Sequence, residues 1–270
     1  MKSIDQQVIL VTGATDGLGF GVAEKLASLG ATVLLHGRSA EKLANAKSLI
    51  EKRTGNTKLK TYQADFASLQ QIRDLASDIL KSESSLDVLI NNAGIGVEST
   101  RRESDDGIEL TFQVDYLSTY MLSNLLLPLL KRSAPSRIVN VASAGQAPID
   151  FSNPLLIRDW SGVQAYCQAK LAQINFTFRM AKDLENTGVT VNAFHPASYM
   201  PTKIVKGLFS VQSSIEEGVD ATLNLAVSRE LKTTSGRYFN GMSEEQPNSQ
   251  ASNIAMQRAL KELSEQLTGI

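Results

Sequence analysis

Hydrophobic and polar residues follow two patterns along this chain. Short apolar runs, typical of buried strands, recur at 8–11, 32–35, 59–63, 88–90, 138–141, 189–194 and 236–239. Longer segments with apolar residues every three or four positions, typical of helices, cover 18–29, 41–53, 69–80, 107–131, 163–184, 215–227 and 252–267. Strands that alternate with helices, and that are apolar on both faces, predict an α/β fold. We expect a doubly wound parallel sheet of the Rossmann type, with helices on both faces.

Two long segments interrupt this alternation, at 145–162 and 197–214. Long loops in compact domains are often functional, so we expect both to form the substrate mouth. No linker rich in Pro, Gly and Ser divides the chain, and no repeat has a fixed period. The sequence therefore predicts one domain over residues 1–270.

Composition excludes several classes of partner. A net charge of −1 gives no electrostatic reason to bind nucleic acid or an anionic membrane. The longest apolar stretch, 125–130, is too short for a membrane span, and the polar N-terminal residues do not resemble a signal peptide. One cysteine and two histidines make a poor metal set, so we expect no metal and a reducing, cytoplasmic location. The sequence leaves open whether the protein forms a homo-oligomer.

A glycine-rich turn follows the first strand. Gly13 would permit a tight turn, Gly17 would let the backbone approach a pyrophosphate, and Gly19 would let helix and strand pack closely. The alternative is an ordinary Gly-rich turn, but the position at the first strand-to-helix junction favours dinucleotide binding at the helix N-terminus. The expected contacts in this loop are Gly13, Thr15, Asp16, Gly17, Leu18 and Gly19.

The end of the second strand predicts which dinucleotide binds. An acidic residue there would accept a hydrogen bond from the ribose 2′-hydroxyl of NAD, but this chain has Arg38 and Ser39. Arg38 can pair with a 2′-phosphate, although a solvated surface arginine is the alternative. Ser39 would either add a hydroxyl contact or cap the next helix. We therefore expect NADP(H).

Candidate acid/base chemistry lies in the helix predicted at 163–184. Tyr166 and Lys170 are four residues apart and so lie on one face, where an ammonium can favour the phenolate. Ser143 follows the strand at 138–141, at the sheet edge where open α/β folds bind ligands, and can hold a substrate oxygen. At the same edge lies the run Asn91, Asn92, Ala93 and Gly94, whose glycine permits close approach to a nucleotide and whose asparagines could otherwise be turn residues.

Together these motifs resemble the short-chain dehydrogenase/reductase family over nearly the whole chain. The resemblance implies that Tyr166 is the catalytic acid/base, that Lys170 binds the nicotinamide ribose and lowers the tyrosine pKa, and that Ser143 orients the substrate. It also implies cofactor contacts from Asp65, Phe66, Asn91, Asn92, Ala93, Gly94, Pro196 and Thr202. Without the resemblance, Asp65 would equally be the N-cap of the following helix.

The spacing of the motifs indicates one branch of this family. The interval from Ser143 to Tyr166 and the tail at 235–239 are similar to the branch of retinol dehydrogenases and WW-domain oxidoreductases. This implies an apolar carbonyl or alcohol substrate. One departure concerns the proton relay, where the family usually carries an asparagine and this chain has Asp115, which would pair with Lys170. Another is Ala197, where the family usually has glycine after Pro196.

The sequence predicts an NADP(H)-dependent oxidoreductase. The rival hypothesis is a noncatalytic NADP(H)-binding sensor or scaffold, and Asp115 is the residue that favours it. A second alternative is an epimerase or dehydratase of nucleotide-linked sugars, which would need a larger substrate-binding region. Intact Ser143, Tyr166 and Lys170 favour the oxidoreductase.

Overall fold

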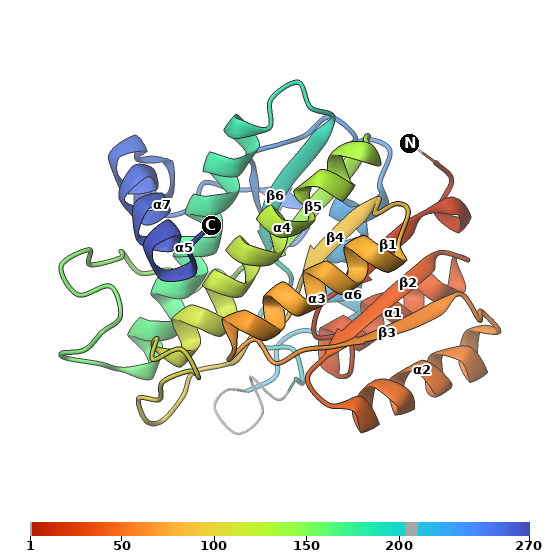
Figure 1. Ribbon diagram of the computed structural model, residues 1–270, viewed down its shortest axis with the longest axis horizontal. Coiled ribbons are helices and arrows are strands. Elements are labelled where there is room, and N and C mark those ends of the chain that lie inside the picture. The colour runs from red at the N-terminus through yellow and green to blue at the C-terminus, as the bar shows by residue number, and fades with distance from the viewer. Residues whose placement is uncertain (1, 203–209) are drawn as a thin grey trace.

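A computed structural model describes residues 2–202 and 210–270. The strands of these described residues form a single sheet (Figure 1). Its strands, in spatial order, are β3 (Leu59–Gln63), β2 (Thr32–Gly37), β1 (Val8–Val11), β4 (Val88–Asn91), β5 (Ser136–Val141), β6 (Val189–His195), β7 (Tyr238–Asn240) and β8 (Ser243–Glu244). The neighbouring strands from β3 to β7 pair in parallel, and β8 pairs antiparallel with β7.

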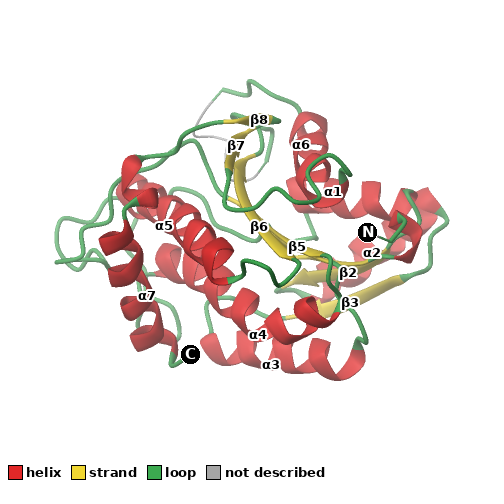
Figure 2. Cartoon of the chain, turned by 90° about the horizontal axis from the view of Figure 1, so that it is seen from above, coloured by secondary structure: helices red, strands yellow, loops and turns green. Residues whose placement is uncertain are grey.

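Helices cover both faces of the sheet (Figure 2). One face carries α1 (Gly17–Ser28), α2 (Ala40–Thr54) and α6 (Ile215–Val227). The other carries α3 (Leu69–Ser82), α4 (Ser118–Arg132) and α5 (Gly162–Asp183), with α7 (Ile254–Thr268) packed on the outside of α5. Short 3-10 turns lie at Ile4–Gln6 and Ser249–Ser252. The predicted doubly wound fold is confirmed.

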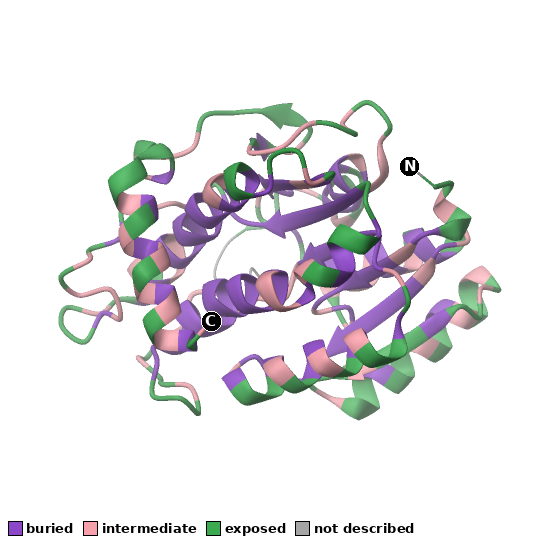
Figure 3. Ribbon diagram, turned by 45° about the horizontal axis from the view of Figure 1, so that its top comes forward, coloured by how far each residue is buried: buried purple, intermediate pink, exposed green. Residues whose placement is uncertain are grey.

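The strands form the middle of the hydrophobic core. Figure 3 shows the central strands almost wholly buried, with the outer faces of the helices exposed. Side chains of β1 alternate between the two helical layers, since Leu10 packs in one apolar cluster, and Ile9 and Val11 in the other. The apolar runs seen in the sequence thus arise because these strands face helices on both sides.

Serine side chains fix where several helices begin. The hydroxyls of Ser39, Ser68, Ser161 and Ser214 accept the backbone N–H three residues ahead, at the first turns of α2, α3, α5 and α6. Each supplies an acceptor that the first helical turn would otherwise lack. Ser39 is therefore a helix cap, as one of the two interpretations of the sequence proposed.

The helix predicted over 107–131 is partly wrong. Gly107 has φ +73° in a turn, helical geometry starts only at Leu110, and a wide π turn spans Phe112–Leu117 before α4. The start is displaced because a carboxylate oxygen of Glu109 accepts the N–H of Phe112 at 2.7 Å and caps the helix there. The π turn carries Asp115.

The C-terminal helix α7 packs beside α5 (Figure 1). Tyr116 and Ser264 share a buried hydrogen bond between their hydroxyls at 2.6 Å, which joins α7 to the π turn. Within the ranges described, the helices are all too short or too polar to cross a bilayer. Of the two predicted mouth loops, 145–162 is fully described, whereas residues 203–209 of the 197–214 loop lie outside the described residues.

Candidate active site

The ends of β1 and β4 are joined by Thr12. Its hydroxyl oxygen accepts the backbone N–H groups of Asn92 and Ala93, both at 2.9 Å. In return, the side-chain amide of Asn92 donates to the carbonyl oxygen of Thr12 at 2.8 Å. These bonds hold the Gly-rich turn against the run 91–94 at the point where the strand order reverses, which is where open α/β sheets bind ligands.

The shape of the Gly-rich turn suits a dinucleotide. Gly13 has φ +67°, and a Cβ on Gly19 would overlap the carbonyl oxygen of Gly13, so both positions require glycine. Helix α1 begins at Gly17, whose N–H is capped by the Asp16 carboxylate at 2.8 Å. The methyl of Thr202 lies beside Gly17, 3.2 Å from where a Cβ would be. The exposed helix N-terminus and the close backbone approach fit a pyrophosphate.

His36 supports this turn from β2, a contact that the sequence did not reveal. Its Nδ1 atom accepts the N–H of Gly13 at 3.3 Å, and its Nε2–H donates to the carbonyl of Ala64 at 3.1 Å. The ring stacks on Phe66 with centroids 4.3 Å apart. Burial lowers the pKa of His36 to about 4, so the imidazole is neutral and can accept from Gly13. Phe66 is buried in this stack.

The residues predicted to meet the adenosine end lie around the ends of β2 and β3. Arg38 is exposed, and within the described residues its guanidinium makes neither a hydrogen bond nor an ion pair. Asp65 does not cap α3, because Ser68 does. Instead the Asp65 carboxylate accepts the N–H of Ala67 at 3.0 Å in a local turn. The N-cap interpretation of Asp65 is therefore wrong.

Asn91 faces the interior of the protein. Its side-chain amide donates to Ser123 at 3.0 Å and to Asn140 at 2.8 Å, and the Asn140 amide donates in turn to Thr177 at 2.8 Å. This buried chain connects β4, β5, α4 and α5. The side chain of Asn91 thus has a structural role, and its predicted contact with a cofactor gains no support from these bonds.

Ser143, Tyr166 and Lys170 come together beyond the end of β5. Tyr166 and Lys170 lie one turn apart on α5, with the lysine Nζ 5.6 Å from the centre of the tyrosine ring. The Ser143 side chain lies close to the Tyr166 phenol and lowers its pKa. The N–H of Gly145 donates to Ser143 Oγ at 3.0 Å, and Tyr238 on β7 donates to the Ser143 carbonyl at 3.0 Å. The serine hydroxyl is thereby fixed beside the phenol.

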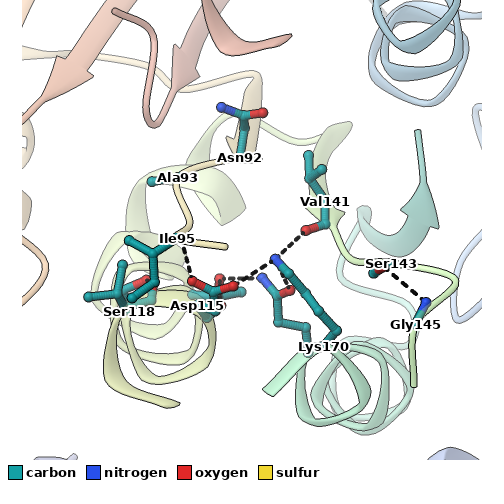
Figure 4. A network of polar contacts seen from close by, with 12 residues as sticks. Asn92, Ala93, Ile95, Asp115, Ser118, Val141, Ser143, Gly145 and Lys170 are labelled. Atoms are coloured by element: carbon teal, nitrogen blue, oxygen red, sulfur yellow. Dashed lines mark hydrogen bonds and ion pairs between the residues drawn. The ribbon is translucent and has the colours of Figure 1, made fainter. Parts of the chain in front are cut away.

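Asp115 also reaches this group, from the π turn (Figure 4). One carboxylate oxygen accepts the N–H of Ile95 at 2.7 Å, and the other lies 3.3 Å from Lys170 Nζ. The carboxylate also packs against Gly94, where a Cβ would lie 3.3 Å from Oδ1. Burial raises the pKa of Asp115, and the Lys170 ammonium opposes that rise.

Burial and several neighbouring groups act on the phenol of Tyr166. Burial raises its pKa, because a phenolate is poorly solvated there. The Lys170 ammonium and the Ser143 side chain lower the pKa, whereas the Asp115 carboxylate raises it. A tyrosine hydroxyl held by a serine beside a lysine can donate a proton to an oxygen atom, or accept one from it.

A comparison with protein families shows which group of proteins this arrangement belongs to. The sequence model of the short chain dehydrogenase family matches residues 7–212, from β1 to the segment ahead of α6. The chain belongs to the short chain dehydrogenase family. The resemblance inferred from the sequence is confirmed, and this dehydrogenase is an oxidoreductase.

Relatives place the dehydrogenase within its family. It is 34% identical to human retinol dehydrogenase 13, covering 99% of this chain and 86% of the relative. It is 33% identical to the zebrafish (Danio rerio) WW domain-containing oxidoreductase, over 98% of this chain and 69% of the relative. A solved structure from Escherichia coli CFT073, of a protein complexed with NADPH, is similar with a TM-score of 0.72 at 26% identity, over 87% of this chain and 96% of that one. The predicted branch is confirmed.

Several residues of this dehydrogenase site were not singled out from the sequence. Thr12, His36 and Tyr238 hold site residues through contacts distant in sequence. Gln173 and Thr119 contact Lys170 and Asp115 within their own helices and are joined to each other across α5 and α4. Buried Pro196 follows β6, which ends at His195, and His195 contacts Ser198 at 3.1 Å rather than the tyrosine. An apolar run followed by a polar residue marks such strand ends, but it does not reveal their partners.

Proposed function

We propose that the protein is an NADP(H)-dependent oxidoreductase that interconverts an apolar carbonyl compound and the matching alcohol, with Tyr166 as acid/base. The observation that carries the proposal is the meeting of Ser143, Tyr166 and Lys170 at the end of β5. This is the same edge of the sheet as the Gly-rich turn Gly13–Gly19, here called the phosphate turn. A noncatalytic binding protein would have no need for this group of side chains.

Different residues would bind the cofactor, hold the substrate and transfer the proton. The turn at Gly13–Gly19 would hold the pyrophosphate, and Arg38 would pair with the 2′-phosphate. The bound cofactor supplies or accepts the hydride. Ser143 holds the substrate oxygen, and Tyr166 donates its proton to that oxygen in reduction or removes it in oxidation. Lys170 holds positive charge beside the phenol.

Two observations support the choice of cofactor. The exposed Arg38 stands where an acid would select NAD, and the similar Escherichia coli protein is complexed with NADPH. Support for an apolar substrate comes from the names of the relatives, retinol dehydrogenases among them. The mouth loop 145–162 also exposes apolar Ile157, whose side chain is 75% accessible.

A substrate screen tests the proposal. The protein is incubated with NADPH or NADH and a panel of apolar aldehydes and ketones, retinal included, and cofactor oxidation is followed. We expect reduction of at least one apolar carbonyl, faster with NADPH than with NADH. If NADPH binds but no member of the panel is reduced, the proposal fails, and a noncatalytic NADP(H)-binding sensor or scaffold takes its place.

A further inference from the structure

The Lys170 ammonium, which lies over the ring of Tyr166, is also surrounded by acceptor atoms. Three acceptor atoms lie around Nζ: the Val141 carbonyl at 3.3 Å, Gln173 Oε1 at 3.1 Å and Asp115 Oδ2 at 3.3 Å. The Lys170 ammonium donates hydrogen bonds to the Val141 carbonyl and to Gln173, whereas its contact with Asp115 Oδ2 is an ion pair without a hydrogen bond. Figure 4 shows the lysine pointing toward Asp115 and Val141.

A chain of hydrogen bonds through Gln173 and Thr119 also connects Lys170 to the backbone of Asp115. The Gln173 amide donates to the Thr119 hydroxyl at 3.0 Å, and that hydroxyl donates to the Asp115 backbone carbonyl at 3.3 Å. Asp115, Thr119, Gln173 and Lys170 are all at least 95% buried. The π turn and α5 are therefore tied together by side chains that also fix the lysine, and water has little access to screen the charges.

Charge is what distinguishes this arrangement from one with a neutral residue at position 115. An asparagine could still accept the Ile95 N–H with its oxygen, but its NH₂ group would then face the Lys170 ammonium, donor against donor. A carboxylate accepts the Ile95 N–H and turns no donor toward the Lys170 ammonium. It places a negative charge 3.3 Å from the one cation beside the phenol among the described residues, and that charge partly offsets the cation's field at Tyr166.

We propose that Asp115 is a positioning residue whose charge offsets that of Lys170, so that Tyr166 keeps its proton and the protein reduces carbonyls up to a higher pH than it would with a neutral residue there. The consequence for turnover rests on the proposed function, with Tyr166 as acid/base. Both limbs of the pH profile, the fall of reduction and the rise of oxidation, lie at higher pH because of Asp115.

Other groups near the two residues do not reverse this effect. Cys167 on α5 and Tyr238 on β7 lie near Tyr166. Burial raises the pKa of each, so both side chains are uncharged near pH 7. Glu109, ahead of the π turn, faces Asp115 and adds negative charge. Lys170 is the cation that acts on both Asp115 and Tyr166.

The test titrates Tyr166 directly, without substrate. Ultraviolet difference absorbance records tyrosinate formation in the intact protein, and subtracting the curve of Tyr166→Phe isolates Tyr166. The pKa values of Tyr62 and Tyr120 are raised to about 12, so these residues titrate at the far alkaline end. Asp115→Asn and Asp115→Ser should each lower the Tyr166 midpoint by about one pH unit or more.

Two variants and a control separate charge from packing. Asn and Ser differ in size but remove the same charge, so a shift in only one of them would overturn the proposal, as would no shift in either. Asp183→Asn removes a charge from the exposed end of α5, where Asp183 pairs with Arg179, and should leave the midpoint in place. An equal shift in this control would also overturn the proposal.

Kinetics then connect the titration to turnover. In the Asp115 variants, the alkaline fall of NADPH-dependent reduction should move to lower pH by the same amount as the tyrosine midpoint. If the titration midpoint of Tyr166 shifts but the alkaline fall of the reduction rate stays at the same pH, the link to catalysis is overturned. If no carbonyl is reduced at all, the proposed function fails, while the titration still decides whether Asp115 controls the proton of Tyr166.

Discussion

His36 on β2 accepts a hydrogen bond from the backbone N–H of Gly13, with 3.3 Å between the two nitrogen atoms. Protonation of His36 would replace this acceptor with a donor, so the phosphate turn depends on a neutral imidazole. The histidine is 2% exposed and stacked on Phe66, which keeps water away from the ring. His36, which takes no part in the proposed reaction, thus makes the phosphate turn sensitive to acid.

We predict that acid destabilises the protein through His36. Its pKa is lowered from 6.5 to about 4 in the folded state, so the unfolded chain binds the proton first, and stability is lost as pH falls from about 6.5 to about 4. The difference corresponds to about 3 kcal/mol of unfolding free energy. Urea unfolding across this range measures the slope.

The control for this prediction is His36→Phe, which keeps a ring against Phe66 but cannot titrate. Its stability should depend less on pH between about 4 and 6.5 than that of the wild type. Part of the slope should remain, since burial also lowers the pKa of His195. Identical slopes in variant and wild type would show that His36 is not the source.

Tyr166→Phe should abolish most carbonyl reduction and leave NADPH binding nearly unchanged. Loss of a positioned acid/base costs about a hundred- to ten-thousandfold in rate, whereas the phosphate turn and Arg38 are untouched. Turnover on a carbonyl from the screen and NADPH fluorescence measure the two effects. Tyr62→Phe, at the edge strand β3, is the matched control. A Tyr166 variant within a few fold of wild type would mean that another group donates the proton.

Arg38→Asp should weaken NADPH binding roughly ten- to hundredfold and remove the preference over NADH, because charge-assisted bonds to the 2′-phosphate are lost and a carboxylate replaces them. Parallel titrations with both cofactors measure the change. Arg132→Asp, an equal change of charge at the exposed end of α4, should bind both cofactors as the wild type does. Retention of the NADPH preference in Arg38→Asp would rule out Arg38 as the selecting residue.

Thr12→Val should destabilise the protein by about 1 to 3 kcal/mol, mainly because the backbone N–H of Ala93 loses its acceptor. The Thr12 hydroxyl accepts the N–H groups of Asn92 and Ala93 at 2.9 Å, but the Asn92 N–H keeps a second acceptor, the Ile90 carbonyl, at 3.1 Å. Chemical denaturation measures the loss. Thr12→Ser keeps the hydroxyl and should retain most of the stability; equal losses in the two variants would attribute the effect to the methyl group instead.

Local patterns in the sequence sufficed for the sheet and for part of the site. The apolar runs at 8–11 and 138–141 marked buried strands, and the spacing of Tyr166 and Lys170 placed both on one helix face. The π turn escaped notice because apolar residues recur without a break from Ile108 to Leu130. Contacts such as Gln173 with Thr119, or Thr12 with Asn92, depend on tertiary geometry. The cytoplasmic location and a homo-oligomeric state stay predictions.

The π turn at Phe112–Leu117 makes the site depend on the number of residues in the chain as well as on their identity. A π turn holds more residues than an α turn, and it commonly marks a functional position inside a helix. Loss of a single residue there would let the segment wind as a regular α-helix and would rotate everything before it by about 100° relative to α4. Asp115 would leave Lys170 although no residue of the site had been replaced. In evolutionary terms, insertions and deletions in this helix can redirect the proton chemistry of the site while its characteristic serine, tyrosine and lysine stay intact.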